Sequence, residues 1–303
     1  MVPTQKVQDL FNVQGLVAVI TGGGSGLGLY AARALDANGA KAVYIVGRRE
    51  DTLKEAAKNA VNGTLIPIVG DVNDKDSLLK VAERVRHEQG FINLLFANAG
   101  VLGPKHAADL GENPSIKEFQ ATMFKSDMKD YSFTQQVNNT AVFYTAVAFL
   151  DLLDNGNKQR NVPQDSQILV TSSIAGLSRH LSSSFAYSTS KAAANHLVKM
   201  LSTYFAQHQY HIRVNGVCPG LYPSEMTAGL TGTMNKFAGI KGHEGAFEDA
   251  HTMDPQRSPA GRTGSEEDFA GVILFLVSKA GAYCNGELMV TDGGRTSVLP
   301  ASY

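Results

Sequence analysis

Residues 16–28 read LVAVITGGGSGLG, a short apolar run that leads directly into a glycine-rich loop. Such a run is typical of a strand that is buried on both faces of a parallel sheet. After the loop, apolar residues recur at helical spacing as far as Asn38-Gly39, which is a common helix stop signal. A second buried strand is predicted at residues 42–46. Strand, loop, helix and strand in this order predict a βαβ unit.

The same alternation continues along the rest of the chain. Apolar runs predict further strands at residues 64–69, 94–97, 168–171, 212–217 and 288–291. Helices are predicted at residues 51–61, 74–89, 133–153 and 266–278, together with a helix that contains Tyr187. Because right-handed crossovers place helices on both faces, the pattern predicts an α/β fold with a doubly wound parallel sheet of about seven strands. No linker or repeat interrupts the pattern, so we expect a single domain over residues 1–303.

Three segments are expected to lie outside this regular pattern. Residues 103–131 contain two prolines and two glycines, and we interpret them as a loop with one short helix. Residues 155–164 are polar and are expected to form a surface connection. Residues 224–260 are long and glycine-rich, yet they carry large apolar side chains at Met226, Leu230, Met234, Phe237, Ile240, Phe247 and Met253. Apolar side chains on an irregular segment of this length predict a mobile lid.

The composition excludes several classes of function. The net charge is −1, so the chain has no basic field that would hold nucleic acid or an anionic membrane. Its two cysteines, Cys218 and Cys284, are far apart, which argues against a disulfide scaffold or a metal site. Residues 1–14 lack the apolar core of a secretory signal, and no stretch of about 18 apolar residues predicts a membrane span. We expect a cytoplasmic protein whose partner is a small molecule.

The glycine loop predicts a nucleotide site. Gly22 would let the strand turn, Gly26 would let a pyrophosphate approach the backbone, and Gly28 would let the helix pack close to the sheet. The N–H groups at the start of the helix would then face the phosphates. A tight turn that merely needs positive φ is the structural alternative. The position of the loop between a buried strand and an amphipathic helix favours nucleotide binding.

The residues after the second strand indicate which nicotinamide cofactor would be accepted. A carboxylate at this position would bind the 2′-hydroxyl of NAD, whereas an arginine accommodates the 2′-phosphate of NADP. The chain has Arg48 and Arg49 here and no carboxylate before Glu50. Arg48 is predicted to bind the phosphate through charge-assisted hydrogen bonds, and Arg49 is expected to be the solvated member of the pair.

Tyr187 and Lys191 are four residues apart on a predicted helix, so their side chains share one face. A free phenol has a pKa of about 10, and a neighbouring cation favours the phenolate and lowers that pKa. Tyr187 could therefore exchange protons near neutral pH. A tyrosine and a lysine at this spacing are also common on helix surfaces, so the assignment depends on the other motifs.

Eight motifs occur in one order between residues 10 and 294, and together they resemble the classical short-chain dehydrogenase/reductase family. They are Thr21-Gly22-x-x-x-Gly26-x-Gly28, Asp71, Asn98-Ala99-Gly100, Val137-Asn138, Ser172-Ser173, Tyr187-x-x-x-Lys191, Pro219-Gly220 and Asp292-Gly293-Gly294. The resemblance implies a Rossmann-type sheet and a nicotinamide cofactor, with no need of a metal.

The resemblance also implies a set of catalytic residues. Tyr187 matches the general acid/base, and Lys191 matches the lysine that lowers its pKa and holds the nicotinamide ribose. Ser173 matches the residue that hydrogen-bonds the substrate oxygen, and Asn138 matches the asparagine that helps to keep a water in the proton relay. Ser173 precedes Tyr187 by one residue more than in many members, which suggests an insertion within residues 178–185 and leaves Ser172 as an alternative to Ser173.

The cofactor contacts implied by the resemblance extend along the whole chain. They are Gly22, Gly24, Ser25, Gly26, Leu27, Gly28, Arg48, Asp71, Val72, Asn98, Ala99, Gly100, Tyr187, Lys191, Pro219, Gly220 and Ser224. Asp71 and Val72 match the pair that contacts adenine. Ser224 stands where the family more often has threonine, and its hydroxyl can make the same contact.

These observations predict an NADP(H)-dependent oxidoreductase that interconverts a carbonyl group and a secondary alcohol. The apolar lid favours a mostly apolar substrate, and a polyketide-type or other secondary-metabolite ketone is the first expectation. A 3-oxoacyl thioester is the alternative, because residues 219–227 (PGLYPSEMT) resemble some 3-oxoacyl reductases. The lid carries five acidic and three basic side chains, which does not favour an acidic carrier protein or coenzyme A.

Two further expectations complete the sequence-based interpretation. A non-redox cofactor-binding protein on the same scaffold is an alternative of another class, because a fold alone does not establish catalysis. The complete set of catalytic residues speaks against it. The resemblance also implies a homodimer or homotetramer whose interface is formed by residues 133–153 and 192–206, and the first of these helices is apolar nearly all round.

Overall fold

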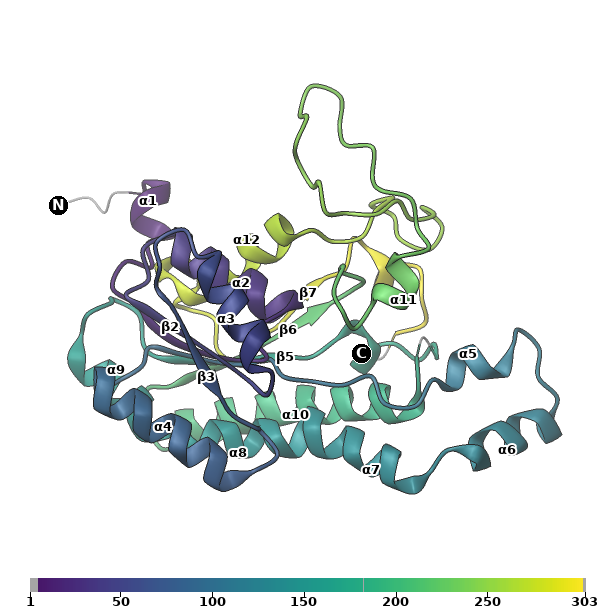
Figure 1. Ribbon diagram of the computed structural model, residues 1–303, viewed down its shortest axis with the longest axis horizontal. Coiled ribbons are helices and arrows are strands. Elements are labelled where there is room, and N and C mark those ends of the chain that lie inside the picture. Colours follow the sequence, from purple (N-terminus) through teal and green to yellow (C-terminus); the bar gives the residue numbers. More distant parts are fainter. Residues whose placement is uncertain (1–4, 182, 302–303) are drawn as a thin grey trace.

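Seven parallel strands form the centre of the computed structural model, which describes residues 5–181 and 183–301 (Figure 1). The strands lie in the order β3-β2-β1-β4-β5-β6-β7. Their bounds are β1 (Val17–Thr21), β2 (Ala42–Gly47), β3 (Leu65–Val69), β4 (Leu94–Ala97), β5 (Gln167–Thr171), β6 (Arg213–Pro219) and β7 (Leu288–Thr291). Every predicted strand overlaps an observed one, and the doubly wound, Rossmann-type sheet is confirmed.

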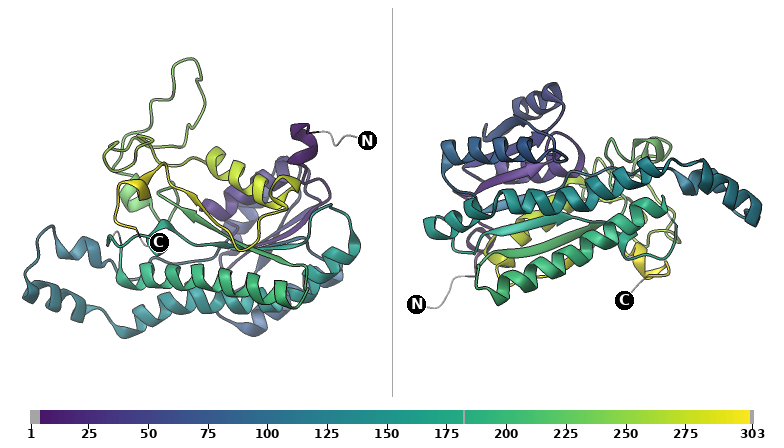
Figure 2. Two further views of the ribbon diagram at one scale, coloured as in Figure 1. Left: turned by 180° about the vertical axis from the view of Figure 1, so that it is seen from behind. Right: turned by 90° about the horizontal axis from the view of Figure 1, so that it is seen from below.

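Helices cover both faces of the sheet (Figures 1 and 2). One face carries α4 (Lys75–Gln89), α8 (Ala141–Ala148), α9 (Leu150–Gln159) and α10 (Phe185–Gln207). The other face carries α2 (Gly26–Ala37), α3 (Glu50–Lys58) and α12 (Glu266–Val277). Shorter elements are α1 (Val7–Leu10), α11 (Ala228–Thr231) and the 3₁₀ turns Ile174–Gly176, Lys279–Gly281 and Arg295–Ser297.

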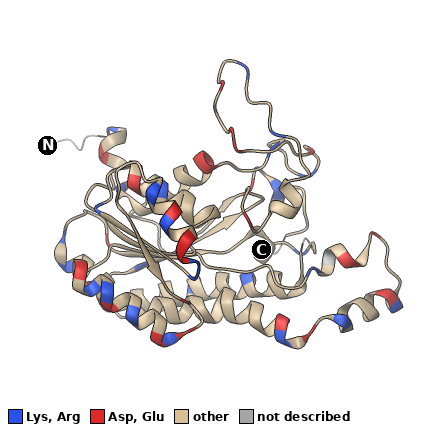
Figure 3. Cartoon of the chain, in the orientation of Figure 1, with Lys and Arg blue, Asp and Glu red and all other residues tan. Residues whose placement is uncertain are grey.

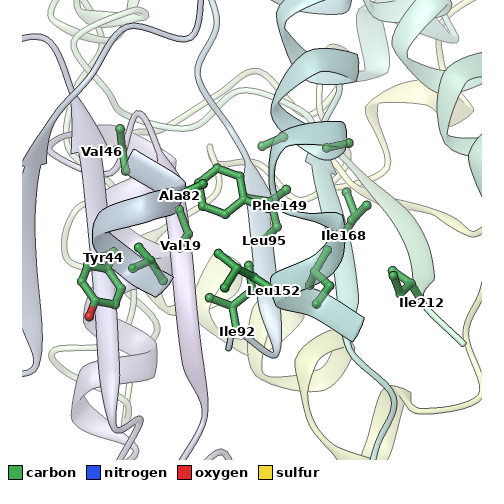
Figure 4. Close-up of a cluster of buried hydrophobic side chains, with 14 of the residues drawn as sticks. Val19, Tyr44, Val46, Ala82, Ile92, Leu95, Phe149, Leu152, Ile168 and Ile212 are labelled. Carbon is green, nitrogen blue, oxygen red and sulfur yellow. The ribbon is translucent and has the colours of Figure 1, made fainter. Parts of the chain in front are cut away.

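Alternate residues of each strand enter two separate hydrophobic layers, as the two-residue period of a strand requires. Val17 and Val19 of β1 pack into the layer under α4, α8 and α10, part of which Figure 4 shows. Ala18 and Ile20 pack into the layer under α2, α3 and α12. All of these side chains are buried, which explains why the strand is a continuous apolar run in the sequence.

The segment 103–131 is more helical than predicted. It contains α5 (His106–Leu110), α6 (Ile116–Lys125) and the start of α7 (Met128–Gln135), and α5 and α6 extend outward from the body as an arm (Figure 1). Ser115 caps α6, because its hydroxyl accepts the amide of Glu118 while the Glu118 carboxylate accepts the amide of Ser115. The prediction of one short helix was therefore wrong, since the breakers separate the helices rather than remove them.

The predicted helix over residues 133–153 is also divided in the structure. A π-helical turn at Gln136–Thr140 joins α7 to α8, and the chain breaks at Phe149, whose φ and ψ are −112° and 4°. Helix α9 then occupies residues 150–159, so half of the predicted polar connection is helical. Leu152 and Leu153 are buried, which explains why this stretch folds onto the sheet.

Residues 224–260 are irregular, as predicted, apart from the short helix α11. Their distal part projects from the body as a long loop, which Figure 1 shows above α11.

Figure 3 shows both signs of charge interspersed along α3 and α4. Within the described part of the chain, no helix combines the length and the apolar character needed to cross a membrane. The sequence of residues 1–14 predicts no secretory signal, and residues 1–4 of this segment lie outside the described residues.

Candidate active site

A cavity lies at the carboxyl ends of the central strands, between β1 and β4. The chain leaves these neighbouring strands in opposite directions, toward β2 on one side and β5 on the other. Ligands of doubly wound proteins bind at such a switch point. The volume of the cavity, about 620 Å³, is within the range of roughly 300–1,000 Å³ that is usual for sites of small molecules and cofactors.

Nearly all residues predicted from the sequence line this one cavity. They are Gly22, Gly24, Ser25, Gly26, Leu27, Arg48, Asp71, Val72, Asn98, Ala99, Gly100, Ser173, Tyr187, Lys191, Pro219, Gly220 and Ser224. The other two, Gly28 and Asn138, are not among the lining residues of the cavity and lie behind its wall. Residues more than 200 positions apart in the sequence are therefore brought together as predicted.

The glycine loop makes a turn that other residues would resist. Gly22 and Gly26 have φ values of 65° and 53°, in the left-handed region that favours glycine. The Gly22 amide donates to the carbonyl of Val46 at a distance of 2.8 Å, which fixes the loop against the end of β2. Helix α2 begins at Gly26, so the N–H groups of its first turn, which have no partner within the helix, are next to the cavity.

Gly28 supports the loop from behind. A Cβ atom at this position would lie 2.3 Å from the carbonyl oxygen of Gly22 and 2.5 Å from Nδ2 of Asn98. The sequence predicted that Gly28 permits close packing of the helix on the sheet. The close approach in the structure is to the glycine loop itself and to the asparagine that holds it.

Asn98 connects the ends of three strands. Its Nδ2 donates to the carbonyl oxygens of Thr21, at 3.0 Å, and Gly22, at 3.2 Å. Its Oδ1 accepts a hydrogen bond of 2.9 Å from the hydroxyl of Thr171 at the end of β5. The asparagine thus fixes the glycine loop relative to β4 and β5, where the catalytic candidates lie.

The outer end of the cavity lies beside the loops that follow β2 and β3. Asp71 accepts the Asn73 amide at 2.9 Å in a tight turn, and its own amide donates to the hydroxyl of Ser77 at 2.9 Å. Arg48 is exposed at this rim and makes no ion pair within residues 5–181 and 183–301. Arg49 also lines the cavity, and its Nη2 lies 2.6 Å from Oε2 of Glu225. The prediction that Arg49 is simply solvated missed this ion pair.

Tyr187 lies at the inner end of the cavity, in the first turn of α10. The hydroxyl of Ser184 caps this helix by accepting the Tyr187 amide at 3.0 Å. Burial raises the pKa of the Tyr187 phenol above its usual value, although a hydrogen bond with the Ser173 side chain acts in the opposite direction. The sequence predicted a lowered pKa. In the structure, the loss of solvent outweighs this hydrogen bond, so the pKa of the phenol is raised rather than lowered.

Lys191 is buried one turn further along α10. Its Nζ donates to the carbonyl oxygen of Thr171 at 2.8 Å and lies 5.8 Å from the centre of the Tyr187 ring. Burial lowers the pKa of Lys191 to about 8. The buried thiol of Cys218 is near this ammonium group, and burial raises the pKa of Cys218 to about 11, so the thiol is neutral.

The structure gives the two serines after β5 different surroundings. The hydroxyl of Ser172 is buried and donates to the backbone carbonyl of Lys191 at 3.1 Å. The hydroxyl of Ser173 accepts the Ala175 amide at 3.1 Å and interacts with the phenol of Tyr187. These contacts favour Ser173 over Ser172. The predicted insertion at residues 178–185 includes Ser182, which lies outside the described residues.

Asn138 is fully buried in the π-helical turn between α7 and α8. Its Oδ1 accepts the Val101 amide at 2.9 Å, and its Nδ2 donates to the Val101 carbonyl at 2.9 Å. Nδ2 also donates to the hydroxyl of Ser190 at 3.0 Å, and that hydroxyl donates to the carbonyl of Tyr187 at 2.7 Å. The Asn138 side chain therefore joins the strand-end loop after β4 to the helix of Tyr187 and Lys191.

The segment after β6 forms the remaining wall. A Cβ atom on Gly220 would lie 2.8 Å from Cα of Asp292, so the two motifs Pro219-Gly220 and Asp292-Gly293-Gly294 meet here. Ser224 packs against the glycine loop, because a Cβ atom on Gly26 would lie 3.1 Å from Cβ of Ser224. This wall brings the start of the predicted lid over the first turn of α2.

Several residues of the cavity were not predicted from the sequence. They include Leu102 and Phe133, which line the cavity together with Val137 of the predicted motif Val137-Asn138 and Met226 of the predicted lid. Leu102 lies two residues after the predicted motif Asn98-Ala99-Gly100, so its position could have indicated it. No sequence motif indicated that Phe133 lines the cavity, because the direction of its side chain depends on where helix α7 begins. Glu225 could be recognised only through its distant partner Arg49.

The residues present fit a nicotinamide dinucleotide. Gly22, Gly24 and Gly26 have no side chains to cover the glycine loop, and the positive φ values of Gly22 and Gly26 suit glycine. Two arginines lie at the outer end of the cavity, and Tyr187, Ser173 and a buried lysine lie at the inner end. A long cavity with anion-binding groups at one end and proton-transfer groups at the other matches a cofactor with a phosphorylated nucleotide and a reactive ring.

Comparisons with known proteins agree with this geometry. A family model described as short chain dehydrogenase matches residues 16–235. The short-chain dehydrogenase/reductase PhomF of Diaporthe leptostromiformis is 43% identical over 302 residues, which cover 99% of this chain and 98% of the relative. The short-chain dehydrogenase/reductase VdtF of Byssochlamys spectabilis is 38% identical and covers 97% of each chain.

A solved structure has the same fold. The Pseudomonas aeruginosa RhlG/NADP active-site complex has a TM-score of 0.74 and 27% sequence identity, and the match covers 94% of this chain and 98% of that one. In that structure the ligand of the active-site complex is NADP. With a family model over most of the chain and relatives similar over nearly their full length, this protein belongs to the short-chain dehydrogenase/reductase family and is an oxidoreductase.

Proposed function

We propose that this protein is an NADP(H)-dependent oxidoreductase that interconverts a ketone or aldehyde and an alcohol on a mostly apolar small molecule. One observation carries the proposal. Tyr187, Ser173 and Lys191 line one end of the cavity whose other end is formed by the glycine loop and the two arginines. A carbonyl carbon placed beside Tyr187 would be next to the reactive ring of a bound cofactor.

The catalytic roles follow from these positions. When bound, the nicotinamide supplies or accepts the hydride. In the reducing direction, Tyr187 donates its phenolic proton to the substrate oxygen, and its raised pKa keeps that proton in place at neutral pH. Ser173 donates a hydrogen bond to the same oxygen as negative charge develops on it. Lys191 contributes a positive charge next to the phenol and stabilises the phenolate that remains.

The choice of NADP(H) is supported by the outer end of the cavity. Arg48 is exposed there and free of ion pairs within the described residues, so its guanidinium is available to a phosphate. No carboxylate occupies the end of β2, where NAD-binding proteins usually have one. A guanidinium forms paired, charge-assisted hydrogen bonds with phosphate oxygens.

The proposed substrate is mostly apolar because large apolar residues line the cavity. They are Leu102, Phe133, Val137 and Met226, whereas the basic side chain at the inner end, Lys191, is buried and donates to the carbonyl oxygen of Thr171. A polyketide-type or other secondary-metabolite ketone is our first candidate. A 3-oxoacyl thioester is the second, supported by the sequence of residues 219–227.

The test is a substrate panel with the purified protein. NADPH oxidation would be followed with aromatic ketones, alicyclic ketones and a 3-oxoacyl thioester, and NADP⁺ reduction with the corresponding alcohols. We expect turnover of at least one apolar ketone, and the Tyr187→Phe variant as control should show none. NADPH binding without turnover of any ketone or alcohol would favour the non-redox alternative.

We also propose that residues 224–260 act as a lid. Only residues 224–227 of this segment line the cavity in the present conformation, while Phe237 and Phe247 pack near Arg262, with 6.0 and 3.8 Å between its Cζ atom and the ring centres. The exposed apolar side chains of Leu230 and Ile240 have no cover in this state. Hydrogen exchange tests this proposal, because amides of residues 226–247 should become more protected when NADPH and a substrate ketone bind.

Finally, we propose a homodimer or homotetramer. Phe143, Tyr144 and Val147 of α8 and Met200 and Tyr204 of α10 are exposed on the outer surface of these helices. Large apolar side chains gathered on neighbouring helices favour contact with a second chain. Light scattering at micromolar concentration should give a multiple of the chain mass of 32.4 kDa, and a monomer would contradict the proposal.

A further inference from the structure

An ion pair joins two walls of the cofactor cavity. Nη2 of Arg49 lies 2.6 Å from Oε2 of Glu225, and both residues line the cavity. Arg49 directly precedes α3, after β2, whereas Glu225 belongs to the segment that follows β6. The two residues are 176 positions apart in sequence. The pair therefore connects the nucleotide half of the chain to the start of the proposed lid.

The segment around Glu225 is attached to the glycine loop at a second place. The hydroxyl of Tyr30 in α2 donates to the carbonyl oxygen of Pro223 at 2.9 Å. Ser224 lies against Gly26, as the 3.1 Å separation between their Cβ positions shows. The Arg49–Glu225 pair is the outermost of these three attachments, and its side chains are 61% and 58% exposed. Because water and salt screen such an exposed pair, it is easily exchanged for a stronger partner.

The position of the pair suggests what that partner is. Arg49 is adjacent to Arg48, which we propose as the ligand of the cofactor's 2′-phosphate. A phosphate monoester carries about −1.5 to −2 charges at pH 7 and presents three acceptor oxygens, whereas Glu225 presents one negative charge. A phosphate placed between the two arginines would compete with the Glu225 carboxylate for Arg49, and the carboxylate would repel it.

We propose that Arg49 exchanges Glu225 for the 2′-phosphate of NADP(H), so that Glu225 is a competitor that lowers the affinity for the phosphorylated cofactor. This inference rests on the proposed use of NADP(H). A cofactor without the 2′-phosphate has no group that would displace Glu225, so the ion pair remains intact when it binds. Exchange also frees the outer attachment of residues 222–227, which links the phosphate to the start of the lid.

Calorimetric titration of variants tests the exchange without any turnover. The ligands are NADPH, NADH, adenosine 2′,5′-bisphosphate and ADP, which separate the phosphate from the nicotinamide. Glu225→Gln should lower the dissociation constants of the two 2′-phosphorylated ligands by about three- to tenfold, because it removes the charge that competes with the phosphate. It should change the dissociation constants of the other two ligands by less than about twofold. Arg49→Gln should weaken the two phosphorylated ligands by about tenfold. In the Arg49→Gln background, Glu225→Gln should have much less effect.

Glu50→Gln is the matched control. Glu50 is next to Arg49 in sequence but pairs with Lys54 at 2.7 Å and does not line the cavity. The same loss of one charge should change the affinity for NADPH by less than about twofold. If Glu50→Gln and Glu225→Gln increase the affinity for NADPH equally, the effect arises from the overall charge of the protein, and the proposed exchange is wrong.

The outcomes distinguish this inference from the proposed cofactor. In one outcome, the unmodified protein prefers NADPH while Glu225→Gln increases the affinity for NADPH and NADH equally. In that case Glu225 does not compete with the 2′-phosphate for Arg49, and the cofactor assignment stands. If the unmodified protein binds NADPH no more tightly than NADH, and the bisphosphate no more tightly than ADP, the cofactor assignment fails and the exchange fails with it.

Discussion

The two ends of the active-site cavity are built in different ways. At the nucleotide end, the glycine loop depends on residues that lack a Cβ atom: Gly22 and Gly26 have positive φ, and Gly28 behind the loop leaves no space for a single additional carbon atom. At the substrate end, the lining includes residues of segments outside the sheet, such as Leu102 and Phe133. The first end is set by geometry that few sequences satisfy, and the second by side chains that can be exchanged.

Helix α6 of the arm contrasts with the buried strands that hold the nucleotide end. It has no buried residue, and Ile116 and Phe124 are 86% and 85% exposed. Its contact near the catalytic helix is the edge-to-face pair of Phe119 and Phe185, with ring centres 6.2 Å apart. By contrast, β1 is buried along its whole length. We expect substitutions at the nucleotide end to be costly and substitutions of exposed residues in the arm to have small effects on stability.

The largest effect is expected at the substrate end, where Tyr187 lies. Tyr187→Phe removes the proton donor and leaves the phosphate contacts untouched, so turnover should fall by at least about a thousandfold while the dissociation constant of NADPH changes by less than about threefold. Steady-state rates and calorimetric titration measure the two quantities. Retention of more than about a tenth of the original turnover would exclude Tyr187 as the general acid.

A large effect is also expected for Gly28→Ala at the nucleotide end. The new Cβ would lie 2.3 Å from the carbonyl oxygen of Gly22, so the glycine loop must shift and NADPH affinity should fall by about a hundredfold or more, or the protein should lose several kcal/mol of stability. Gly229→Ala is the matched control, because a Cβ there meets nothing within 4 Å. Its free energy of unfolding should change by less than about 1 kcal/mol. Similar losses in both variants would contradict the contrast between the two ends.

A smaller effect is expected at the exposed rim of the nucleotide end. Arg48→Ala should weaken NADPH by about 1.5–3 kcal/mol, the contribution of a hydrogen bond to a charged group, and leave NADH nearly unchanged. Parallel titrations with both cofactors measure the difference. An equal loss for NADPH and NADH would show that Arg48 stabilises the loop rather than binds the phosphate.

The smallest effect is a change with pH that tests the buried pair at the inner end. Lys191 has a pKa of about 8 and loses its charge as the pH rises through that value, whereas Tyr187 keeps its proton to higher pH. In the reducing direction kcat/KM should therefore fall above pH 8, by about tenfold per pH unit. Lys191→Arg keeps its charge and should remove this fall, although its rate is lower. A flat profile up to pH 9.5 would contradict the role of Lys191.

The same contrast explains what could be predicted from the sequence. The strands were found because burial on both faces makes them continuous apolar runs, as in residues 17–21. The arm was missed because Gly111 and Pro114 were interpreted as evidence for a loop, although Ser115 and Glu118 carry a capping pattern that predicts α6. The break at Phe149 had no local signal, because the burial of that residue decides it.

Within the site, motifs could be placed but contacts could not. Residues such as Asn98 and Gly220 are recognisable because each belongs to a short pattern with a fixed order. The pairing of Arg49 with Glu225 depends on a tertiary approach between distant segments, so neither residue indicates it alone. The direction of the Tyr187 pKa was predicted wrongly for a similar reason, since the sequence shows the neighbouring lysine but not the loss of solvent.

The π-helical turn at Gln136–Thr140 limits which deletions in the sequence the protein can tolerate. Such a turn accommodates one residue more than an ordinary turn. Loss of a single codon here would restore regular α-helix and rotate α7 against α8 by about 100°. Phe133 would then turn away from the cavity, or Asn138 would lose its contacts with Val101 and Ser190. In-frame deletions should therefore be tolerated in the exposed arm and eliminated by selection a few codons later.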